Sequence, residues 1–252
     1  MSTNPRHDQI INLLQKLRTL TVNELTERLG VSPVTIRKDL TLLEEQGLIA
    51  RSHGGAKLAQ DVMNGTNLVK RGQAQTEIKE RLATKALDLV QDGDTIYLDS
   101  GSSVGAMAMS LRNRAIRVIT NSLQVLNALA DAPDLSLIAV GGNYRLEAGS
   151  FIGPGANETV GRFQVDLAFM GATAFSEKGM FFSQNVIESQ LKEAVLLHAS
   201  RRIIVADSTK YKAQAFSLFA RPNLVDILVT DSGFPSQAIE TFAGLGIELV
   251  VG

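Results

Sequence analysis

The 252-residue chain contains no cysteine, no tryptophan and only three histidines. The absence of cysteine excludes a disulfide framework and a thiolate metal site, and the spacing of His7, His53 and His198 fits no metal-binding motif. We therefore expect no metal and no cofactor. No apolar run approaches the roughly 18 residues that a membrane-spanning helix needs, and the polar residues 1–8 lack the pattern of a secretion signal. These absences favour a cytoplasmic protein with no membrane partner.

The chain also has no strong excess of charge of either sign. Its formal net charge is −1, and 44% of its residues are hydrophobic and 20% charged, as in an ordinary globular protein. Residues 1–60 hold eight basic and six acidic residues, a net charge of +2, which leaves −3 for the remainder. This asymmetry is too small to establish nucleic-acid binding by itself. The length suits one large domain, or a small domain followed by a medium one.

Residues 30–43 have the pattern of a DNA-recognition helix. Ser32 is a residue type that caps helices, and Pro33 suits the first helical position because no backbone N–H is needed there. Three apolar residues are spaced to share one buried face of this helix. They are Ile36, Leu40 and Leu43.

The opposite face of the same helix carries groups that suit DNA. At about 100° per residue, Val34, Lys38 and Thr41 point away from the buried face, with Arg37 beside them. Cations, a hydroxyl and a methyl-rich side chain can meet phosphates, base-edge acceptors and thymine methyl groups. The alternative is an amphipathic helix with a solvated basic face, and the neighbouring elements favour recognition.

Two further helices are predicted before the recognition helix. Residues 6–17 have apolar positions at helical spacing. Thr21 and Glu24 form a capping box that starts a short second helix, and Gly30 is the natural left-handed stop after it. Three helices with a tight turn between the second and third indicate a helix-turn-helix.

A small hairpin is predicted directly after Gly47. Residues 48–58 read as two short strands around a turn of Gly54 and Gly55, in the position of the wing of a winged helix. Ile49, Arg51 and His53 alternate toward one face. A plain hairpin that completes a small core is the alternative. The wing residues expected to reach phosphates or a minor groove are Arg51, His53 and Lys57.

The rest of the chain reads as a linker and an α/β domain. Residues 59–75 have no clear period and are interpreted as the linker, and from residue 76 helices and apolar strands alternate. This alternation predicts a mainly parallel sheet covered on both faces. Strands are expected at 95–99, 116–120, 135–140, 167–170, 203–206, 227–230 and 248–251. Helices are expected from 76 to near 93 and at 104–111, 123–130, 186–199 and 237–243.

Small polar or glycine-rich loops follow several of these strands, where open α/β sheets bind ligands. The loop Ser100, Gly101, Ser102 and Ser103 is the most informative, because its N–H groups, its hydroxyls and the following helix could face one anion such as phosphate. Capping of an ordinary βα turn is the alternative. The polar strand ends are residues 99–103, 120–122, 141–143, 171–173 and 207–210.

Two lysines could add positive charge to such a site. Lys192 falls within the helix expected at 186–199, and Lys210 falls in the loop after the strand at 203–206. Taken alone, each reads as a solvated surface lysine. They are included because of the family resemblance described next.

Both halves of the chain resemble the DeoR family of bacterial transcriptional regulators. The N-terminal resemblance lies in residues 31–40 (Val-Ser-Pro-Val-Thr-Ile-Arg-Lys-Asp-Leu) and 53–55 (His-Gly-Gly). The motifs that resemble the family's effector domain are 99–103 (Asp-Ser-Gly-Ser-Ser), 120–122 (Thr-Asn-Ser), 141–142 (Gly-Gly), 169–171 (Phe-Met-Gly) and 207–210 (Asp-Ser-Thr-Lys). These motifs, in this order, span nearly the whole chain.

The resemblance implies a small α+β winged helix-turn-helix domain at 1–58, a linker at 59–75 and a ribose-phosphate-isomerase-like α/β domain at 76–252. It implies a sugar-operon repressor that binds double-stranded operator DNA, is relieved by a phosphorylated sugar and forms homo-oligomers. The expected DNA-binding residues are Ser32, Val34, Thr35, Arg37, Lys38, Thr41, Arg51, His53 and Lys57. The expected effector-binding residues are Asp99, Ser100, Gly101, Ser102, Ser103, Thr120, Asn121, Ser122, Gly141, Gly142, Lys192, Asp207 and Lys210.

A sugar-phosphate isomerase is one alternative function. Isomerases of similar fold move a proton with carboxylates, in a pattern Asp-Gly-Ala-Asp after the strand that matches 167–170. Residues 171–174 read Gly-Ala-Thr-Ala, so both acids are missing, although Glu188 and Glu193 lie nearby in sequence. We therefore expect no enzymatic activity. The other alternative, a phosphosugar-binding protein without DNA binding, disagrees with the intact outer face of the recognition helix.

Overall fold

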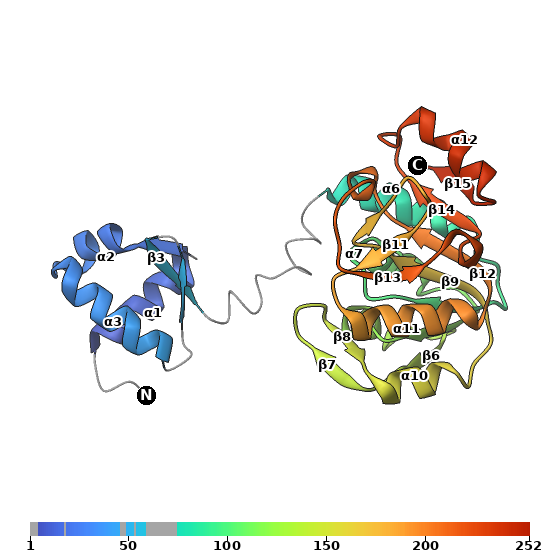
Figure 1. Cartoon of the computed structure of the whole chain (residues 1–252). Coiled ribbons are helices and arrows are strands. Elements are labelled where there is room, and N and C mark those ends of the chain that lie inside the picture. The colour runs from blue at the N-terminus through green and yellow to red at the C-terminus, as the bar shows by residue number, and fades with distance from the viewer. Residues whose placement is uncertain (1–4, 18, 46–48, 53, 59–74) are drawn as a thin grey trace. The chain divides into compact units, whose positions relative to one another are not determined.

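A computed structural model describes residues 5–17, 19–45, 49–52, 54–58 and 75–252 (Figure 1). The chain divides into two compact units, Met1–Lys70 and Arg71–Gly252. Nearly all of the linker expected at 59–75 lies outside the described residues. In the described ranges, no helix combines the length and the apolar character needed to cross a membrane.

The first unit packs three described helices against a small antiparallel sheet with the strand order β1-β3-β2. Its core joins residues of all three helices to Leu20, Ile49 and Ala56 of the sheet. The helices are α1 (Pro5–Leu17), α2 (Val22–Leu29) and α3 (Pro33–Glu45), and the strands are β1 (Thr19–Thr21), β2 (Ile49–Ser52) and β3 (Gly55–Leu58).

The local signals in the sequence fix where α2 begins and ends. The Thr21 hydroxyl accepts a hydrogen bond from the Glu24 N–H, and the Glu24 carboxylate accepts one from the Thr21 N–H at 2.7 Å. This is the predicted capping box. Gly30 closes the helix with a left-handed backbone, φ 65°, as predicted.

The wing differs from the prediction in two details. Ser52 pairs with Gly55, so Gly55 belongs to β3 rather than to the turn. A glycine is needed there because β3 runs against β1, where a Cβ on Gly55 would lie 2.2 Å from the Leu20 carbonyl oxygen. Strand β1 was not predicted, because its three residues are too few to show a period. Ile49 and Arg51 share the predicted alternation, but only Ile49 is buried.

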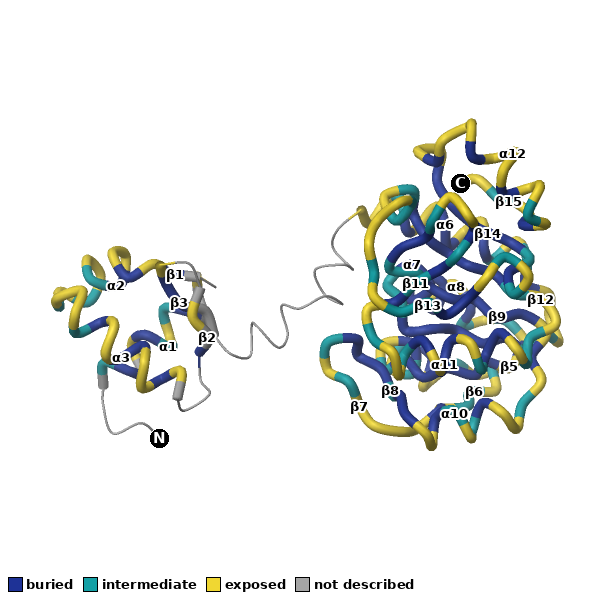
Figure 2. The backbone as a smooth tube through the Cα atoms, in the orientation of Figure 1, coloured by how far each residue is buried: buried dark blue, intermediate teal, exposed yellow. Residues whose placement is uncertain are grey.

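The second unit is built on a parallel seven-stranded sheet, which confirms the predicted α/β architecture. Its inner strands are mostly buried, as Figure 2 shows, whereas the residues of the two outermost strands are intermediate or exposed. The strands in spatial order are β15 (Glu248–Val251), β14 (Ile227–Thr230), β12 (Ala199–Val205), β9 (Val165–Gly171), β4 (Thr95–Leu98), β5 (Arg117–Thr120) and β6 (Ser136–Ala139).

Two apolar clusters cover the two faces of this sheet. Ile96 and Leu98 of β4 join one cluster, and Tyr97 between them joins the other, because successive side chains of a strand alternate. The helices on the Ile96 side are α6 (Thr76–Leu87), α7 (Ser102–Gly105), α8 (Ala108–Leu111) and α9 (Leu123–Leu129). The helices that contribute to the Tyr97 side are α10 (Pro154–Val160), α11 (Val186–Leu197) and α12 (Ser236–Gly244).

Several elements of this unit were not predicted. The helix expected at 104–111 is instead two single turns, α7 and α8, and α7 begins at Ser102. A hairpin of β7 (Asn143–Arg145) and β8 (Ser150–Ile152) follows β6. A small antiparallel sheet has the order β10-β11-β13, with β10 (Ala174–Phe175), β11 (Phe181–Ser183) and β13 (Ser217–Ala220). Each of these strands has four residues or fewer, which leaves too little sequence for a period of two to be visible.

Candidate nucleic-acid interface and effector site

The outer face of α3 is exposed as the sequence predicted. Arg37 and Lys38 are exposed, and Val34 keeps 60% of its surface in solvent. Together with Thr41 and Leu42 these residues line a shallow hollow on the helix. The Thr41 hydroxyl donates to the Arg37 carbonyl at 2.9 Å, so this hydroxyl already has a partner within the helix.

The side chains of Ser32 and Thr35 form hydrogen bonds at the start of α3. The Ser32 hydroxyl accepts from the Thr35 N–H at 3.2 Å, and the two hydroxyls lie 2.9 Å apart. Ser32 is exposed and Thr35 half-buried. The predicted cap is thereby confirmed, and capping satisfies a backbone donor that the helix leaves free.

The wing and the start of α2 form a groove beside α3. Arg37 and Arg51 line it together with Asn23 and Gly54. Asn23 was not among the predicted DNA-binding residues, although an exposed polar residue inside the capping box is a signal that the sequence contains. His53 lies outside the described residues, and the side chain of Lys57 is likewise not described. Two guanidinium groups on one groove make a phosphate backbone a suitable occupant.

A buried carboxylate joins α3 to α1. Asp39 is 4% exposed and accepts hydrogen bonds from Arg6 Nε at 2.5 Å and Arg6 Nη2 at 3.1 Å. His7 Nε2 lies 3.3 Å from the same carboxylate. The hydrogen bonds from Arg6 hold the pKa of Asp39 below its usual value. Helix α1 thus holds α3 in position through a side chain on the buried face of α3.

The strand order of the large sheet creates a switch point between β4 and β9. The chain passes from β4 outward to β5 and β6, returns to β9 beside β4, and then continues outward through β12 to β15. Ligands of open α/β sheets bind beyond the carboxyl ends of the strands at such a point. Asp99 follows β4 and Gly171 ends β9, so the predicted Asp99 loop lies at this place.

Asp99 and Lys192 form a buried ion pair at the switch point. The Lys192 ammonium contacts Asp99 Oδ2 and donates to the Gly171 carbonyl at 3.0 Å, and it lies 5.4 Å from the centre of the Phe219 ring. The Gly171 N–H also donates to Asp99 Oδ2, at 2.9 Å. Lys192 is 4% exposed, so its interpretation as a solvated surface lysine was wrong.

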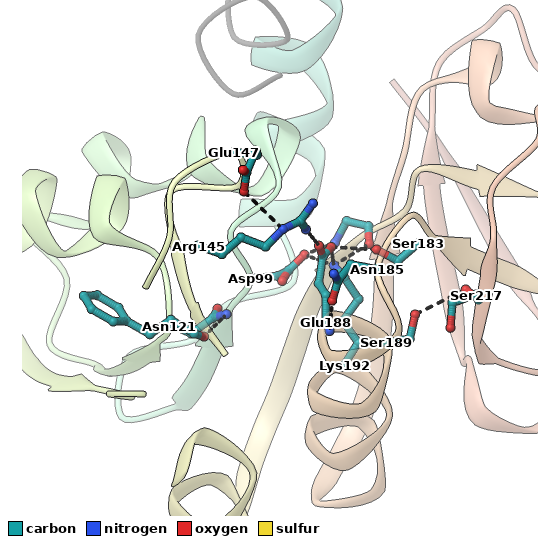
Figure 3. A network of polar contacts seen from close by, with 12 residues as sticks. Asp99, Asn121, Arg145, Glu147, Ser183, Asn185, Glu188, Ser189, Lys192 and Ser217 are labelled. Atoms are coloured by element: carbon teal, nitrogen blue, oxygen red, sulfur yellow. Dashed lines mark hydrogen bonds and ion pairs between the residues drawn. The ribbon is translucent and has the colours of Figure 1, made fainter. Parts of the chain in front are cut away.

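The pair belongs to a row of five alternating charges, Glu147, Arg145, Glu188, Lys192 and Asp99 (Figure 3). Arg145 Nη1 donates to Glu188 Oε2 at 2.7 Å, and Glu188 Oε1 lies 3.6 Å from Lys192 Nζ. Side-chain exposure falls along the row from 46% at Glu147 to 2% at Asp99. Glu188 and Lys192 are four apart on α11, a spacing that the sequence could have revealed. Arg145 carried no such signal.

The loop of Ser100, Gly101, Ser102 and Ser103 has an ordinary extended backbone at its glycine. Gly101 has φ −63° and ψ 142°, which any residue can adopt, so a left-handed backbone is not the reason for this glycine. A Cβ at Gly101 would instead lie 3.2 Å from the Gly171 Cα. The helix that follows has one turn, so its dipole adds little charge and any anion depends on the loop's own donors.

The residues after β5 serve the structure in different ways. The Thr120 hydroxyl donates to the Leu98 carbonyl at 2.6 Å, and the Ser122 hydroxyl caps α9. Asn121 Nδ2 donates to the Phe151 carbonyl at 3.0 Å. Asn121 Oδ1 is buried with no partner among the described residues. Of these three side chains, only Asn121 retains a free polar atom.

The remaining residues expected to bind the effector follow strands that are farther from β4. Gly141 and Gly142 are exposed and follow β6, two strands from β4. Asp207 follows β12, two strands away on the other side, and accepts from the Thr209 N–H at 3.1 Å. Lys210 is half-exposed. The predicted residues thus share one edge of the sheet but do not form one compact cluster.

The fold and these sites define a two-unit protein with a winged helix and an α/β domain of the sensor type. Residues 6–62 match the DeoR-like helix-turn-helix domain, and residues 74–232 match the DeoR C terminal sensor domain. The chain belongs to the DeoR family of transcriptional regulators.

Curated relatives align over nearly the full length of the chain. The HTH-type transcriptional repressor CsqR of Escherichia coli (strain K12) is 34% identical over 252 residues, covering 100% of this chain and 96% of that protein. The glycerol-3-phosphate regulon repressor of the same organism is 32% identical, covering 99% of each chain. The lactose phosphotransferase system repressor of Lactococcus lactis subsp. lactis is 32% identical, covering 96% of each.

Solved structures show more distant likenesses. Ribose 5-phosphate isomerase A of Methanocaldococcus jannaschii is 18% identical with a TM-score of 0.41, covering 55% of each chain. The β subunit of eIF2B from Chaetomium thermophilum is 17% identical with a TM-score of 0.45, covering 68% of this chain and 53% of that one. Both likenesses are in the fold alone.

Proposed function

We propose that the protein represses a sugar-catabolic operon by binding double-stranded operator DNA, and that a phosphorylated sugar relieves this repression. The outer face of α3 carries the proposal, because Arg37 and Lys38 are exposed there beside an exposed apolar side chain, Val34. Full-length relatives are named repressors, two of them of the glycerol-3-phosphate regulon and of a lactose phosphotransferase system.

In this proposal α3 enters the major groove and the wing contacts the backbone beside it. Lys38 and Arg37 read base-edge acceptors, and Val34 and Thr41 contact thymine methyl groups. Arg51, with Asn23 in the same groove, holds a phosphate. Ser32 and Thr35 position α3 through the cap and contact the backbone, and the wing residues His53 and Lys57 remain proposed contacts.

The effector binds at the carboxyl edge of the large sheet, at the switch point between β4 and β9. Its phosphate is held by the N–H groups of residues 100–103 and by the hydroxyls of Ser102 and Ser103. The five-charge row sums to −1, so it repels a dianion and favours the neutral hydroxyls of the sugar. The other strand-end residues, Thr120, Ser122, Gly141, Gly142, Asp207 and Lys210, border this site.

The two sites regulate each other through linkage. The sugar phosphate shifts the protein only if it binds one state better than the other. When it weakens DNA binding, DNA weakens its binding by the same factor. A coupling of about 1–3 kcal/mol changes operator affinity roughly 5–150-fold.

We also propose that the sensor unit has no isomerase activity. Residues 171–174 carry no acid, and Glu188, one of the acids nearby in sequence, accepts hydrogen bonds from Ser183 and Arg145 on its two oxygens. A carboxylate engaged in this way is not free to take a substrate proton. Purified protein incubated with pentose and hexose phosphates should show no turnover, and turnover that follows protein concentration through purification would overturn this part.

The protein acts as a homo-oligomer in this account, with paired or repeated half-sites in the operator. Val186 and Ile187 are exposed at the start of α11, and the Ser189 hydroxyl of that helix donates to the Ser217 carbonyl, next to the 77% exposed Phe216. Exposed apolar side chains close together are a feature of interfaces. Sedimentation of the full chain at micromolar concentration should give a species larger than 27.1 kDa.

We propose that each part of the chain has its own role. Residues 1–58 bind DNA, residues 76–252 sense the effector, and residues 59–75 join them as a linker. Proteolysis of the native chain tests these boundaries, because cleavage should concentrate in the joining segment and should release a fragment that retains effector binding.

A binding titration tests the main proposal. Fluorescence anisotropy with DNA from upstream of the chain's own gene should give specific binding that unrelated DNA does not compete away. The Arg37→Ala, Lys38→Ala double variant should lose about 1–3 kcal/mol for each base contact removed. A Lys178→Ala, Arg221→Ala double variant removes equal charge from exposed sites of the sensor unit and serves as the control. Equal affinity of the two double variants would contradict the proposal.

A further inference from the structure

Two residues with a free acceptor oxygen, Asp99 and Asn121, follow the neighbouring strands β4 and β5. Leu98 pairs with Thr120 in the parallel register, so the residues that follow them, Asp99 and Asn121, stand at neighbouring strand ends. Neighbouring strands are about 4.8 Å apart. Two side chains that follow neighbouring strands are close enough to accept hydrogen bonds from two hydroxyl groups of one ligand.

Both groups offer oxygen atoms that need donors. The contacts of Asp99 among the described residues all use Oδ2, which leaves Oδ1 for another donor. Asn121 is 1% exposed, and its Oδ1 has no partner while its Nδ2 is held by the Phe151 carbonyl. A buried acceptor without a donor is rare, and it indicates a missing partner. A phosphate dianion has no proton to donate, whereas a sugar hydroxyl does.

The hairpin of β7 and β8 covers this pair. Strand β8 lies against Asn121, since the Phe151 N–H donates to the Asn121 carbonyl at 2.9 Å. The Ser150 hydroxyl on the same strand is fully buried and also has no partner among the described residues. A ligand can reach Asn121 Oδ1 only when the hairpin lifts, because that atom is enclosed in the present arrangement.

An ion pair ties the hairpin to the opposite side of the site. In Figure 3, Arg145 extends from β7 past Asp99 to Glu188 on α11. Arg145 also pairs with Glu147 at 3.5 Å, but that partner belongs to the hairpin's own turn. Among the described residues, the Arg145–Glu188 contact is therefore the ion pair that joins β7 to α11.

We propose that Asp99 and Asn121 bind two adjacent hydroxyls of the effector, and that Arg145 is a positioning residue that latches the hairpin over them through Glu188. The inference rests on the proposed effector site and adds its ligand chemistry, a polyol phosphate with a vicinal diol near the acceptors. The phosphate lies toward residues 100–103, away from the carboxylate of Asp99. The latch opens for entry and closes on the bound diol.

Calorimetry on the full chain tests the hydroxyl pair. The probes are glycerol 3-phosphate, ribose 5-phosphate, 2-deoxyribose 5-phosphate, glucose 6-phosphate, fructose 6-phosphate and inorganic phosphate. At least one hydroxylated phosphate should bind roughly tenfold or more tightly than inorganic phosphate. Asn121→Ala should weaken that binding roughly five- to tenfold, about the contribution of one hydrogen bond, and leave inorganic phosphate unaffected. Equal binding of all probes, or an equal loss for inorganic phosphate, would overturn the proposal.

Hydrogen exchange tests the latch without a ligand. Arg145→Met should accelerate exchange of the amides in residues 143–152, and Arg145→Lys should restore part of the protection because it keeps the charge. Glu147→Gln is the matched control, since it removes the pair within the hairpin and leaves Arg145–Glu188 in place. Unchanged exchange in Arg145→Met would overturn the latch. Operator binding by the wild type, measured separately, reports on the proposed function and not on this inference.

Discussion

Gly101 and Gly171 meet where β4 and β9 end, and a side chain on either would fit only if its neighbour shifted. A Cβ on Gly101 would lie 3.2 Å from the Gly171 Cα, and a Cβ on Gly171 would lie 3.3 Å from the Gly101 Cα and from Asp99 Oδ2. The two loops can therefore approach closely enough for Asp99 to accept from the Gly171 N–H. This contact holds the loop of residues 100–103 against the end of β9, where the Gly171 carbonyl accepts a hydrogen bond from Lys192.

Replacing Gly101 with alanine should separate these loops. The added methyl group must push Gly171 away by a few tenths of an ångström, and overpacking of this kind destabilises proteins by about 1–3 kcal/mol. Thermal unfolding of the sensor unit should shift downward and the affinity for sugar phosphate should fall. Gly155→Ala, where a Cβ meets nothing within 4 Å, is the control and should lower neither, because alanine favours the helix that holds this position. A Gly101→Ala variant indistinguishable from that control would show that the contact is unimportant.

Arg51→Ala should weaken DNA binding without changing sequence preference. Arg51 lines the wing groove, where it is exposed and suited to a phosphate. Each phosphate contact contributes about 0.9 to the slope of log K against log salt, so the slope should become shallower by about one unit. The measurement is a set of operator titrations at several salt concentrations. If Arg51→Ala instead lost the preference for one particular base pair of the operator, Arg51 would contact that base directly.

The Asp39 carboxylate should make the winged helix sensitive to acid. Hydrogen bonds from Arg6 hold its pKa below the usual value, so its contribution to folding is fully present above the unfolded pKa of about 3.9. That contribution is lost as the pH falls through the lowered value. Asp39→Asn should lower the unfolding midpoint of this unit at pH 7 and reduce its dependence on acid. A wild type and variant that differ equally at pH 7 and at pH 2 would contradict this origin.

Local signals predicted the winged helix well because each depends on neighbouring residues. The capping box of Thr21 and Glu24, the left-handed Gly30 and the buried stripe of Ile36, Leu40 and Leu43 all need only the 3.6-residue period and a few contacts. The strand β1 was missed because its three residues owe their conformation to pairing with β3, which is distant in sequence.

The effector site could be located from the sequence but not assembled from it. Asp99 was selected because it follows an apolar strand, and the parallel sheet places it at the switch point. Lys192 was selected only through the family resemblance, because its burial depends on Asp99 and Gly171, which lie far away in the chain. Arg145 was missed altogether, since its role depends on a hairpin of two three-residue strands.

Control of the DNA affinity of α3 by the site after β4 can be measured in a single set of operator titrations. Operator affinity is measured with and without the sugar phosphate that shifts it in the wild type, for wild type, Ser102→Ala and Ser102→Asp. The wild type should lose roughly 5–150-fold in operator affinity when the ligand is added. Ser102→Asp should bind operator normally and ignore the ligand, because its carboxylate repels the phosphate, while Ser102→Ala should retain part of the response. A Ser102→Asp variant that responds to the ligand like the wild type would contradict the account.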